Sequence, residues 1–170
     1  MVIGDPDAPL TIIEYASFTC PHCASFHEKT YWDLKKNYID TGKIKFIFRE
    51  IYFDKYGIWA SMIARCAGPK KFFGLTDMLL SSQRTWARAG DDLAIVTELS
   101  KIARLAGMEE EQIQSCLRDG GKIKALVAWY KDNATADGVR STPSFIIDGQ
   151  LYSNMDYTEF SKLLDEKLGS

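Results

Sequence analysis

The chain of 170 residues is 46% hydrophobic, 26% charged and 12% aromatic. This composition is typical of a folded domain, alone or with an inserted subdomain, and it excludes extensive disorder. The formal net charge is −2 and acidic and basic residues are mixed along the chain, so nothing predicts a nucleic-acid partner. No apolar run is long enough to cross a bilayer.

The first nine residues contain neither the basic segment nor the apolar segment of a secretory signal. Two interpretations are therefore compatible with this end of the chain. The protein is either cytosolic, or it is the mature form of an exported protein behind an added Met1.

The first third of the chain predicts a strand, a helix and a second strand. Residues 10–15 are apolar and rich in β-branched side chains, as in a buried strand. Pro21 suits the first turn of a helix, which should end at Thr41-Gly42. One face of this helix is expected to contain Phe26, Thr30, Leu34 and Tyr38. Residues 43–51 begin with polar and apolar alternation and predict the next strand, which implies a parallel β-α-β unit.

The middle of the chain, from about residue 57 to residue 137, shows no convincing strand pattern. Helices are expected at residues 58–67, 71–81, 92–106, 109–117 and 122–137. The breaks between them are supplied by Gly68-Pro69, Gly90-Asp91, Gly107 and Gly120-Gly121. We therefore expect most of this stretch to be a helical insertion.

The end of the chain predicts a hairpin and a last helix. Residues 143–147 and 150–152 read as strands on either side of Asp148-Gly149. Asp-Gly favours a type I′ turn, in which both central residues need a positive φ. Asp156, with Glu159 after it, predicts the start of the last helix, whose apolar face contains Phe160, Leu163, Leu164 and Leu168.

The chain contains four cysteines, at positions 20, 23, 66 and 116. Four cysteines can pair in three ways, and the short spacing of the first two favours Cys20 with Cys23 and Cys66 with Cys116. Two disulfides would imply an oxidising compartment.

Cys20-Pro21-His22-Cys23 carries the chemistry that is easiest to predict. The spacing places the two sulfurs close enough to bridge, and Cys20 should lie at a helix N-terminus, where N–H groups and the helix dipole stabilise a thiolate. His22 can add a positive charge or a hydrogen bond. These effects lower the pKa of the nucleophile and make the disulfide a stronger oxidant.

Two other interpretations of this motif compete with a redox pair: a structural zinc site and a structural disulfide. Cys20, Cys23 and His27 resemble part of a structural zinc site, but no second ligand pair follows at a suitable spacing. A purely structural Cys20–Cys23 disulfide would restrain very little chain.

Phe18-Thr19-Cys20-Pro21-His22-Cys23, together with Ser141-Thr142-Pro143-Ser144-Phe145 and the hairpin after it, resembles the DsbA family of bacterial thiol oxidases. The resemblance extends over nearly the whole chain. It implies an α/β architecture, a thioredoxin fold with a helical insertion between its β-α-β and β-β-α halves. The corresponding boundaries are residues 1–56, 57–121 and 122–170.

The resemblance also implies roles for residues outside the motif. Pro143 should be cis and face the sulfurs, and the backbone of Thr142 should pair with substrate peptide. An acid at the position of Glu14, beneath the active site, is thought to assist proton transfer, and a buried carboxylate needs a partner in any case. Arg49 is expected to be its basic partner, whereas His27 is expected on the helix surface.

Cys66 and Cys116 fall on two predicted helices of the insertion. They could remain buried free thiols, which pack as small hydrophobic groups. We favour a structural disulfide, provided that the compartment is oxidising. The resemblance is compatible with it, since some DsbA-like proteins have a second disulfide in this region and others lack it.

The function implied is a thiol–disulfide oxidase that acts on cysteine-containing exported proteins. A quinone-coupled membrane oxidase similar to DsbB would regenerate it, no tightly bound cofactor is needed, and the protein is expected to be a monomer in the periplasm. The alternatives are a disulfide reductase or isomerase that uses the same site, a glutathione-dependent enzyme of the kappa type, and a non-catalytic peptide-binding or chaperone module. The Cys20–Cys23 pair argues against the last two.

Overall fold

The computed structural model describes residues 1–169, so that Ser170, the last residue of the expected second half, lies outside the described residues. The strands are β1 (Val2–Ile3), β2 (Leu10–Ala16), β3 (Ile44–Glu50), β4 (Ser144–Ile147) and β5 (Gln150–Ser153). The first helical run comprises α1 (Pro21–Phe26), η1 (His27–Tyr31), α2 (Trp32–Leu34) and η2 (Lys35–Ile39), in which η marks π-helical turns. The other helices are α3 (Lys55–Cys66), α4 (Pro69–Ser81), α5 (Gln83–Trp86), α6 (Asp92–Leu105), α7 (Glu110–Arg118), α8 (Gly120–Ala136) and α9 (Tyr157–Leu168).

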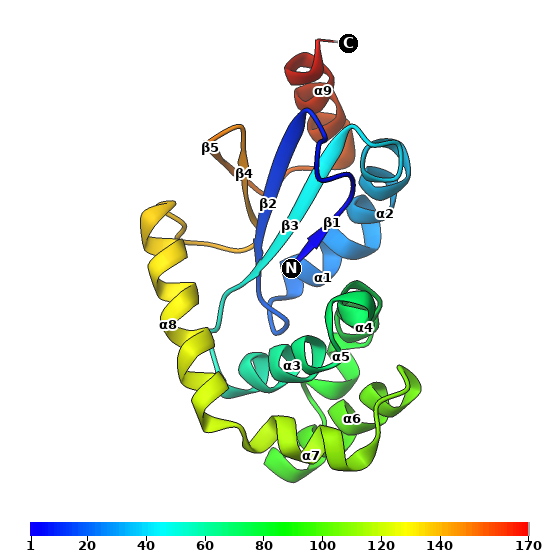
Figure 1. Cartoon of the computed structure of the whole chain (residues 1–170), viewed down its shortest axis with the longest axis vertical. Coiled ribbons are helices and arrows are strands. Elements are labelled where there is room, and N and C mark those ends of the chain that lie inside the picture. Colours follow the sequence, from blue (N-terminus) through cyan, green and yellow to red (C-terminus); the bar gives the residue numbers. More distant parts are fainter. Residues whose placement is uncertain (170) are drawn as a thin grey trace.

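The strands form one mixed sheet in the order β1-β3-β2-β4-β5. Strands β2 and β3 are parallel neighbours, and the helical run from α1 to η2 connects them, as expected for a β-α-β unit. Strand β4 pairs antiparallel with β2, and β5 pairs antiparallel with β4. The predicted thioredoxin fold with a helical insertion between its two halves is confirmed (Figure 1).

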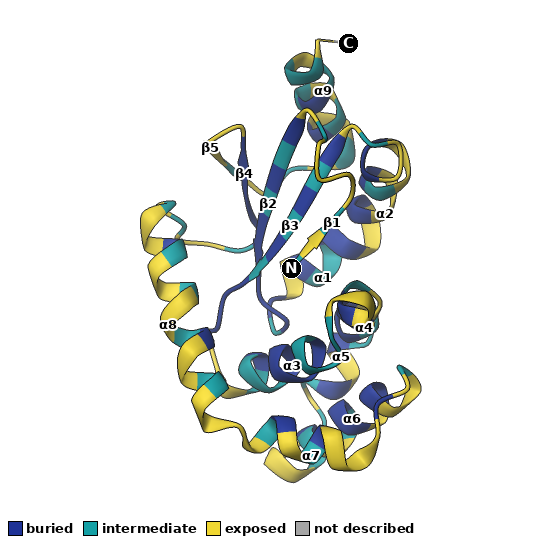
Figure 2. Ribbon diagram, viewed as in Figure 1, coloured by how far each residue is buried: buried dark blue, intermediate teal, exposed yellow. Residues whose placement is uncertain are grey.

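Alternation along β3 decides which side chains face the main core. Ile44, Phe46, Phe48 and Glu50 are buried, and the residues between them are only partly buried. The face with Phe46 and Phe48 packs against the first helical run and α9, through aromatic contacts that include Phe26, Phe145 and Phe160. Figure 2 shows this alternation as dark blue and teal bands along β3.

The other face of the sheet carries a smaller core. Tyr15, Ile51 and Ile146 pack there against Ala134, near the end of α8. Most of α8 is exposed, which Figure 2 shows as a largely yellow helix. The last turn of α8 leads directly into the loop before β4, so this contact places that loop.

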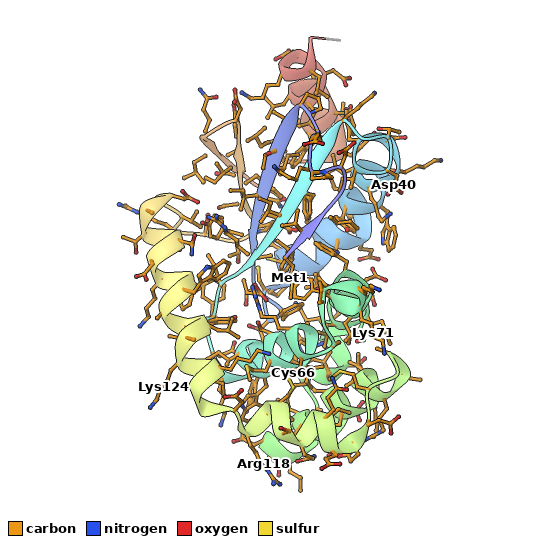
Figure 3. The ribbon with its side chains drawn as sticks, viewed as in Figure 1. Met1, Asp40, Cys66, Lys71, Arg118 and Lys124 are labelled. Carbon is orange, nitrogen blue, oxygen red and sulfur yellow. A yellow bond between two sulfur atoms is a disulfide. The ribbon has the colours of Figure 1, made fainter. Side chains whose placement is uncertain are left out.

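The insertion, α3 to α7, lies at one end of the sheet (Figure 1). A buried ion pair fastens it to β3: both carboxylate oxygens of Glu50 accept hydrogen bonds of 2.6 Å from Arg65 on α3. The hydroxyl of Ser61 donates a third bond, of 3.0 Å, to the same carboxylate. The bidentate contact between Arg65 and Glu50 fixes orientation as well as distance. Figure 3 shows that side chains fill the region between the sheet and the insertion; the label Cys66 marks the end of α3.

Most predicted elements are present, with small shifts of their ends. Asp148 and Gly149 have φ values of 51° and 73°, as the predicted type I′ turn requires. The Asp156 side chain accepts a hydrogen bond from the Glu159 N–H and caps α9. The sequence did not predict β1 or the short helix α5. The break expected at Gly120-Gly121 falls one residue earlier, because Asp119 caps α8 and both glycines lie in its first turn.

Candidate active site

Cys20 stands where the chain passes from β2 into the first helical run. It is the N-cap residue of α1, with extended backbone angles, and Pro21 occupies the first helical turn. Proline costs nothing there, because the first N–H groups of a helix have no partner within the helix. Cys20 is 8% exposed and Cys23, one turn later, is fully buried. Only the first cysteine is therefore accessible to another thiol.

The surroundings of Cys20 favour its anion. A hydrogen bond from the Cys23 thiol is the largest cause of a pKa lowered from 9.0 to about 5, and burial opposes it. Hydrogen bonds with Thr142 and with the backbone N–H groups of Cys23 and His22 lower the pKa further. A thiolate at a helix N-terminus is the reactive form of cysteine.

Cys23 has the opposite character. Burial raises the pKa of its thiol far above the ordinary value, and the hydrogen bond to Cys20 and the charge of Glu14 act in the same direction. The backbone N–H of Ser17 donates to the Cys23 Sγ at 3.5 Å. Both cysteines are free thiols in this structure. The pair thus consists of a stabilised thiolate and a buried neutral thiol.

His22 and Pro21 are both exposed at the surface beside Cys20. The contact that His22 makes with Cys20 comes from its backbone N–H. A contribution from its imidazole ring stays a prediction.

The loop before β4 reaches the same place from the other end of the chain. The Thr142–Pro143 peptide bond is cis, as the resemblance implied. The Cys20 Sγ lies 3.5 Å from the Thr142 carbonyl oxygen, to which it donates a hydrogen bond when it is a neutral thiol. Pro143 is buried and Thr142 is partly exposed. The backbone of Thr142 is thus placed beside the reactive sulfur.

Glu14 is fully buried on β2, as predicted, but its expected partner is wrong. Arg49 is paired in register with Tyr15, whereas Glu14 is paired with Phe48, so Arg49 and Glu14 point to opposite faces of the sheet. The partner that the structure brings to Glu14 is His27, whose Nε2 lies 3.6 Å from the Glu14 Oε2.

The expectation that His27 lies on the helix surface is also wrong. Its ring is 3% exposed and stacks on Tyr31, with centroids 4.3 Å apart and planes inclined by 21°. His27 follows Cys23 by four residues, so both side chains lie on the inner face of the same helical run.

The side chain of Arg49 lies on the other face of the sheet, with Tyr15 and Asp137. Its Nη1 donates to the Tyr15 hydroxyl at 2.7 Å and to Asp137 at 3.0 Å, and Tyr15 donates to the same carboxylate at 2.6 Å. Burial, and next the hydrogen bond to Asp137, raise the pKa of Tyr15 to about 12. This network fastens the end of α8, and with it the loop that carries Thr142.

Gln83 supports the active-site loop and was not predicted. It is buried on α5, and its Nε2 donates to the carbonyl oxygens of Phe18 at 2.8 Å and Cys20 at 2.9 Å. One amide from the insertion thereby holds the backbone on both sides of Thr19. No pattern in the sequence indicated this contact.

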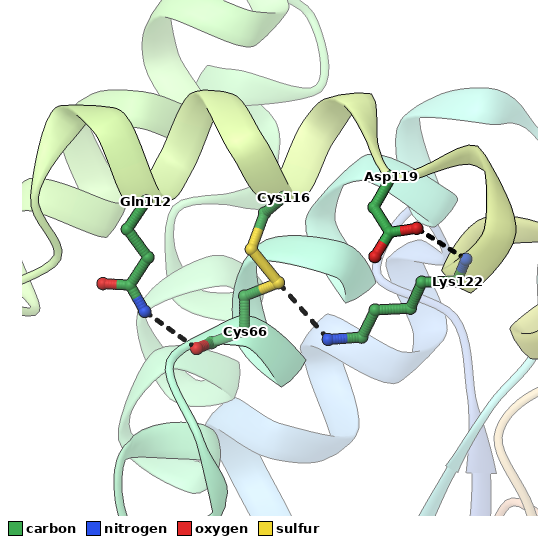
Figure 4. Close-up of a disulfide and its surroundings, with 5 residues drawn as sticks. All are labelled: Cys66, Gln112, Cys116, Asp119 and Lys122. Carbon is green, nitrogen blue, oxygen red and sulfur yellow. Dashed lines mark hydrogen bonds between the residues drawn. A yellow bond between two sulfur atoms is a disulfide. The ribbon is translucent and has the colours of Figure 1, made fainter.

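Cys66 and Cys116 form a disulfide that joins α3 to α7, 50 residues apart in the sequence. Figure 4 shows Lys122, whose Nζ donates to the Cys66 Sγ at 3.3 Å, and Gln112, whose Nε2 donates to the Cys66 carbonyl oxygen at 3.0 Å. The bond therefore lies within the insertion and links two of its helices.

Two further properties concern residues 1–169. In that part of the chain no three His, Cys, Asp or Glu side chains are placed to hold a metal ion together. None of the helices described there has the length and apolar character needed to cross a membrane.

Comparison with known proteins points in one direction. The family model described as thioredoxin matches residues 1–166. A Rickettsia bellii protein provisionally named a protein-disulfide oxidoreductase is 33% identical over 169 residues, which are 99% of this chain and 64% of that protein. The chain therefore spans less than two thirds of the length of this relative.

Solved structures give the same result. The crystal structure of alpha-DsbA1 from Wolbachia pipientis matches with a TM-score of 0.87 and 28% identity, over 99% of this chain and 90% of that one. A protein-disulfide isomerase from Novosphingobium aromaticivorans matches with a TM-score of 0.88 and 25% identity, over 99% of this chain and 97% of that one. The chain belongs to the thioredoxin family and is one of its DsbA-like members.

Proposed function

We propose that this chain is a thiol–disulfide oxidase that introduces disulfides into exported proteins through Cys20 and Cys23. The observation that carries the proposal is the position of Cys20 at the N-terminus of α1, beside Cys23 and the Thr142 loop. Hydrogen bonds there lower the pKa of Cys20 to about 5. Stabilising the thiolate stabilises the reduced pair relative to its disulfide, and that makes the disulfide a stronger oxidant.

The reaction transfers two electrons from a substrate dithiol to the Cys20–Cys23 disulfide. A substrate thiolate attacks the Cys20 sulfur, the bond between the two cysteines breaks, and its electron pair goes to Cys23. The second substrate thiol, as its thiolate, then attacks the substrate sulfur of the mixed disulfide. Cys20 leaves as the stabilised thiolate, and its low basicity makes it a good leaving group.

The loop at Thr142 has a role in this scheme. Its carbonyl oxygen lies beside the Cys20 sulfur, 3.5 Å away. We assign the Thr142 backbone to hold an extended substrate segment next to Cys20, with Pro143 forming the floor. Backbone hydrogen bonds suit this task because they are independent of the substrate sequence.

The cellular setting forms part of the same proposal. A DsbB-like quinone-coupled membrane oxidase would return the pair to the disulfide, and the protein would act as a monomer in the periplasm. The Cys66–Cys116 disulfide supports an oxidising compartment, since disulfides are rare where thiols are kept reduced.

A disulfide isomerase or reductase is the second candidate. The Novosphingobium aromaticivorans neighbour, which matches with a TM-score of 0.88, is described as a protein-disulfide isomerase. The same Cys20 thiolate attacks a substrate disulfide in that case. A reductase passes two electrons to the substrate, the reverse of the oxidase reaction, whereas an isomerase exchanges disulfides with no net electron transfer.

The reduction potential of the Cys20–Cys23 pair, measured in glutathione buffers, distinguishes an oxidase from a reductase. A value of about −120 mV, as in DsbA, fits an oxidase, whereas a value of about −270 mV, as in thioredoxin, indicates a reductase and refutes the proposal. A parallel assay follows oxidation of a peptide dithiol. Cys20→Ser should abolish it, and the double variant Cys66→Ala/Cys116→Ala should retain it as the matched control.

A further inference from the structure

Two polar side chains beneath the redox pair lack hydrogen-bond partners. Both carboxylate oxygens of Glu14 and both ring nitrogens of His27 are buried without a hydrogen-bond partner among the residues that the structure describes. Their closest approach, 3.6 Å from Nε2 to Oε2, lies about 0.5 Å beyond hydrogen-bond range. Burying such groups is costly, so a functional reason is expected.

His27, although buried, borders a space that opens to solvent. It lines a cavity of about 430 Å³ between the first helical run and helices α4 and α5. Exposed side chains, among them Glu28, Trp32 and Arg84, line the same cavity, which therefore opens to solvent. Glu14 does not line it. His27 thus stands between solvent and the buried carboxyl group.

The charged and titratable groups around His27 come from several elements. Glu14 faces it from β2, Tyr31 stacks on it from the next turn, and Phe48 of β3 meets its ring edge to face. Across the cavity lie Asp77 of α4 and Arg84 of α5, and Glu28 is its neighbour on the same helical run. Imidazole is the side chain that most readily takes up and releases a proton near neutral pH.

We infer that His27 is a positioning residue that passes protons between the cavity and Glu14, and so to and from Cys23. The inference rests on the proposed thiol–disulfide chemistry of the Cys20–Cys23 pair and deepens it. Cys23 needs such a route because it is fully buried and its sulfur is not in contact with solvent.

When the disulfide is reduced, a proton moves inward from solvent to Cys23. The substrate thiolate forms a bond to the Cys20 sulfur, and the electron pair of the broken S–S bond goes to Cys23. A proton then passes from His27 through the Glu14 carboxylate to the Cys23 sulfur. His27 regains a proton from solvent in the cavity. In the reverse reaction Cys23 loses its proton along the same path before its sulfur attacks.

The reaction of the reduced protein with 5,5′-dithiobis(2-nitrobenzoate) isolates this proton transfer. Cys20 attacks first and releases one thionitrobenzoate. Cys23 must then lose its proton, and its sulfur displaces the second thionitrobenzoate from Cys20. The two releases form separate phases, and only the second requires a proton to leave Cys23.

His27→Ala should slow the second phase by about 10-fold or more and leave the first phase unchanged. Added imidazole should restore the second phase, because the truncated side chain leaves space that joins the cavity. His27→Gln should be slow and resist rescue, since its side chain fills the space but takes up no proton. Tyr31→Phe, which keeps the stacked ring and loses only the hydroxyl, is the matched control and should behave as the wild type.

An unchanged second phase in folded His27→Ala or His27→Gln overturns the inference. So does slowing that imidazole cannot restore in His27→Ala, or equal slowing of both phases, since a structural role would produce either. If His27→Ala does not fold, the phase ratio of His27→Gln decides. No protein substrate takes part, so the relay and the proposed oxidase function succeed or fail separately.

Discussion

The thiol of Cys23 should be the largest single contributor to the acidity of Cys20, and two substitutions of Cys23 test this directly. Its hydrogen bond is the largest cause of the Cys20 pKa of about 5. Cys23→Ala removes the donor, whereas Cys23→Ser keeps a donor of similar size. A hydrogen bond to a charged group contributes about 1.5–3 kcal/mol, which corresponds to about 1–2 pKa units. We therefore expect the Cys20 pKa to rise to about 6–7 in Cys23→Ala and to stay near the wild-type value in Cys23→Ser.

The difference is largest at low pH. At about pH 5 roughly half of Cys20 is thiolate in the wild type, and about a tenth or less should be in Cys23→Ala. The rate of alkylation by iodoacetamide, measured against pH, reports this fraction. Both variants leave Cys20 as the single free thiol of the site, because Cys66 and Cys116 are bonded to each other. If Cys23→Ala and Cys23→Ser titrate together at the wild-type value, the reasoning is refuted.

Three more outcomes follow from the structure. The pKa of Cys20 is lowered from 9.0 to about 5, so its contribution to stability is complete above about pH 9 and is lost as the pH falls through about 5. The reduced wild type should therefore lose free energy of unfolding relative to Cys20→Ser over that range in urea titrations, and a constant difference would contradict this. Cys66→Ala/Cys116→Ala should lose up to about 4 kcal/mol of unfolding free energy, because the disulfide closes a loop of about 50 residues and so lowers the entropy of the unfolded chain. A loss below about 1 kcal/mol would contradict this entropic explanation. Gln83→Ala should cost about 1–3 kcal/mol, because it removes two buried hydrogen bonds and leaves the Phe18 carbonyl oxygen without its Gln83 donor, while the Cys20 carbonyl oxygen keeps the Ala24 N–H. Exposed Thr85→Ala on the same helix should cost about 0.5 kcal/mol or less, and equal effects would show that the Gln83 bonds are unimportant.

The sequence predicted the elements well where one strong local pattern decided them. The alternation in residues 43–51 and the Asp148-Gly149 turn each depend on neighbours along the chain. The cysteine motif was likewise readable, because its helix-start position follows from Pro21 and the strand before it. The elements that were missed are β1, with two residues, and α5, with four. Elements of that length carry too few residues for a period to appear.

The errors at the site have a different origin. Arg49 was matched to Glu14 by its position near the end of β3, but side chains alternate between faces, and Phe48 is the residue opposite Glu14. The four-residue spacing of Cys23 and His27 already indicated that His27 faces inward. These two corrections were available from periodicity.

Gln83 could not have been found in this way. Its partners are carbonyl oxygens 63 and 65 residues earlier in the chain, and backbone oxygens have no sequence signature. Contacts between a side chain and distant backbone depend on how the insertion docks against the sheet, which only the folded structure reveals.

The contact between Cys20 and Thr142 spans 122 residues. A ribosome that adds about 5–20 residues per second makes Cys20 roughly 6–24 s before Thr142. During that interval the nascent chain carries the cysteine motif without the loop that borders it. The reactive sulfur thus lacks its Thr142 neighbour for the first seconds after synthesis, and the complete site can form only after residue 142 has been translated.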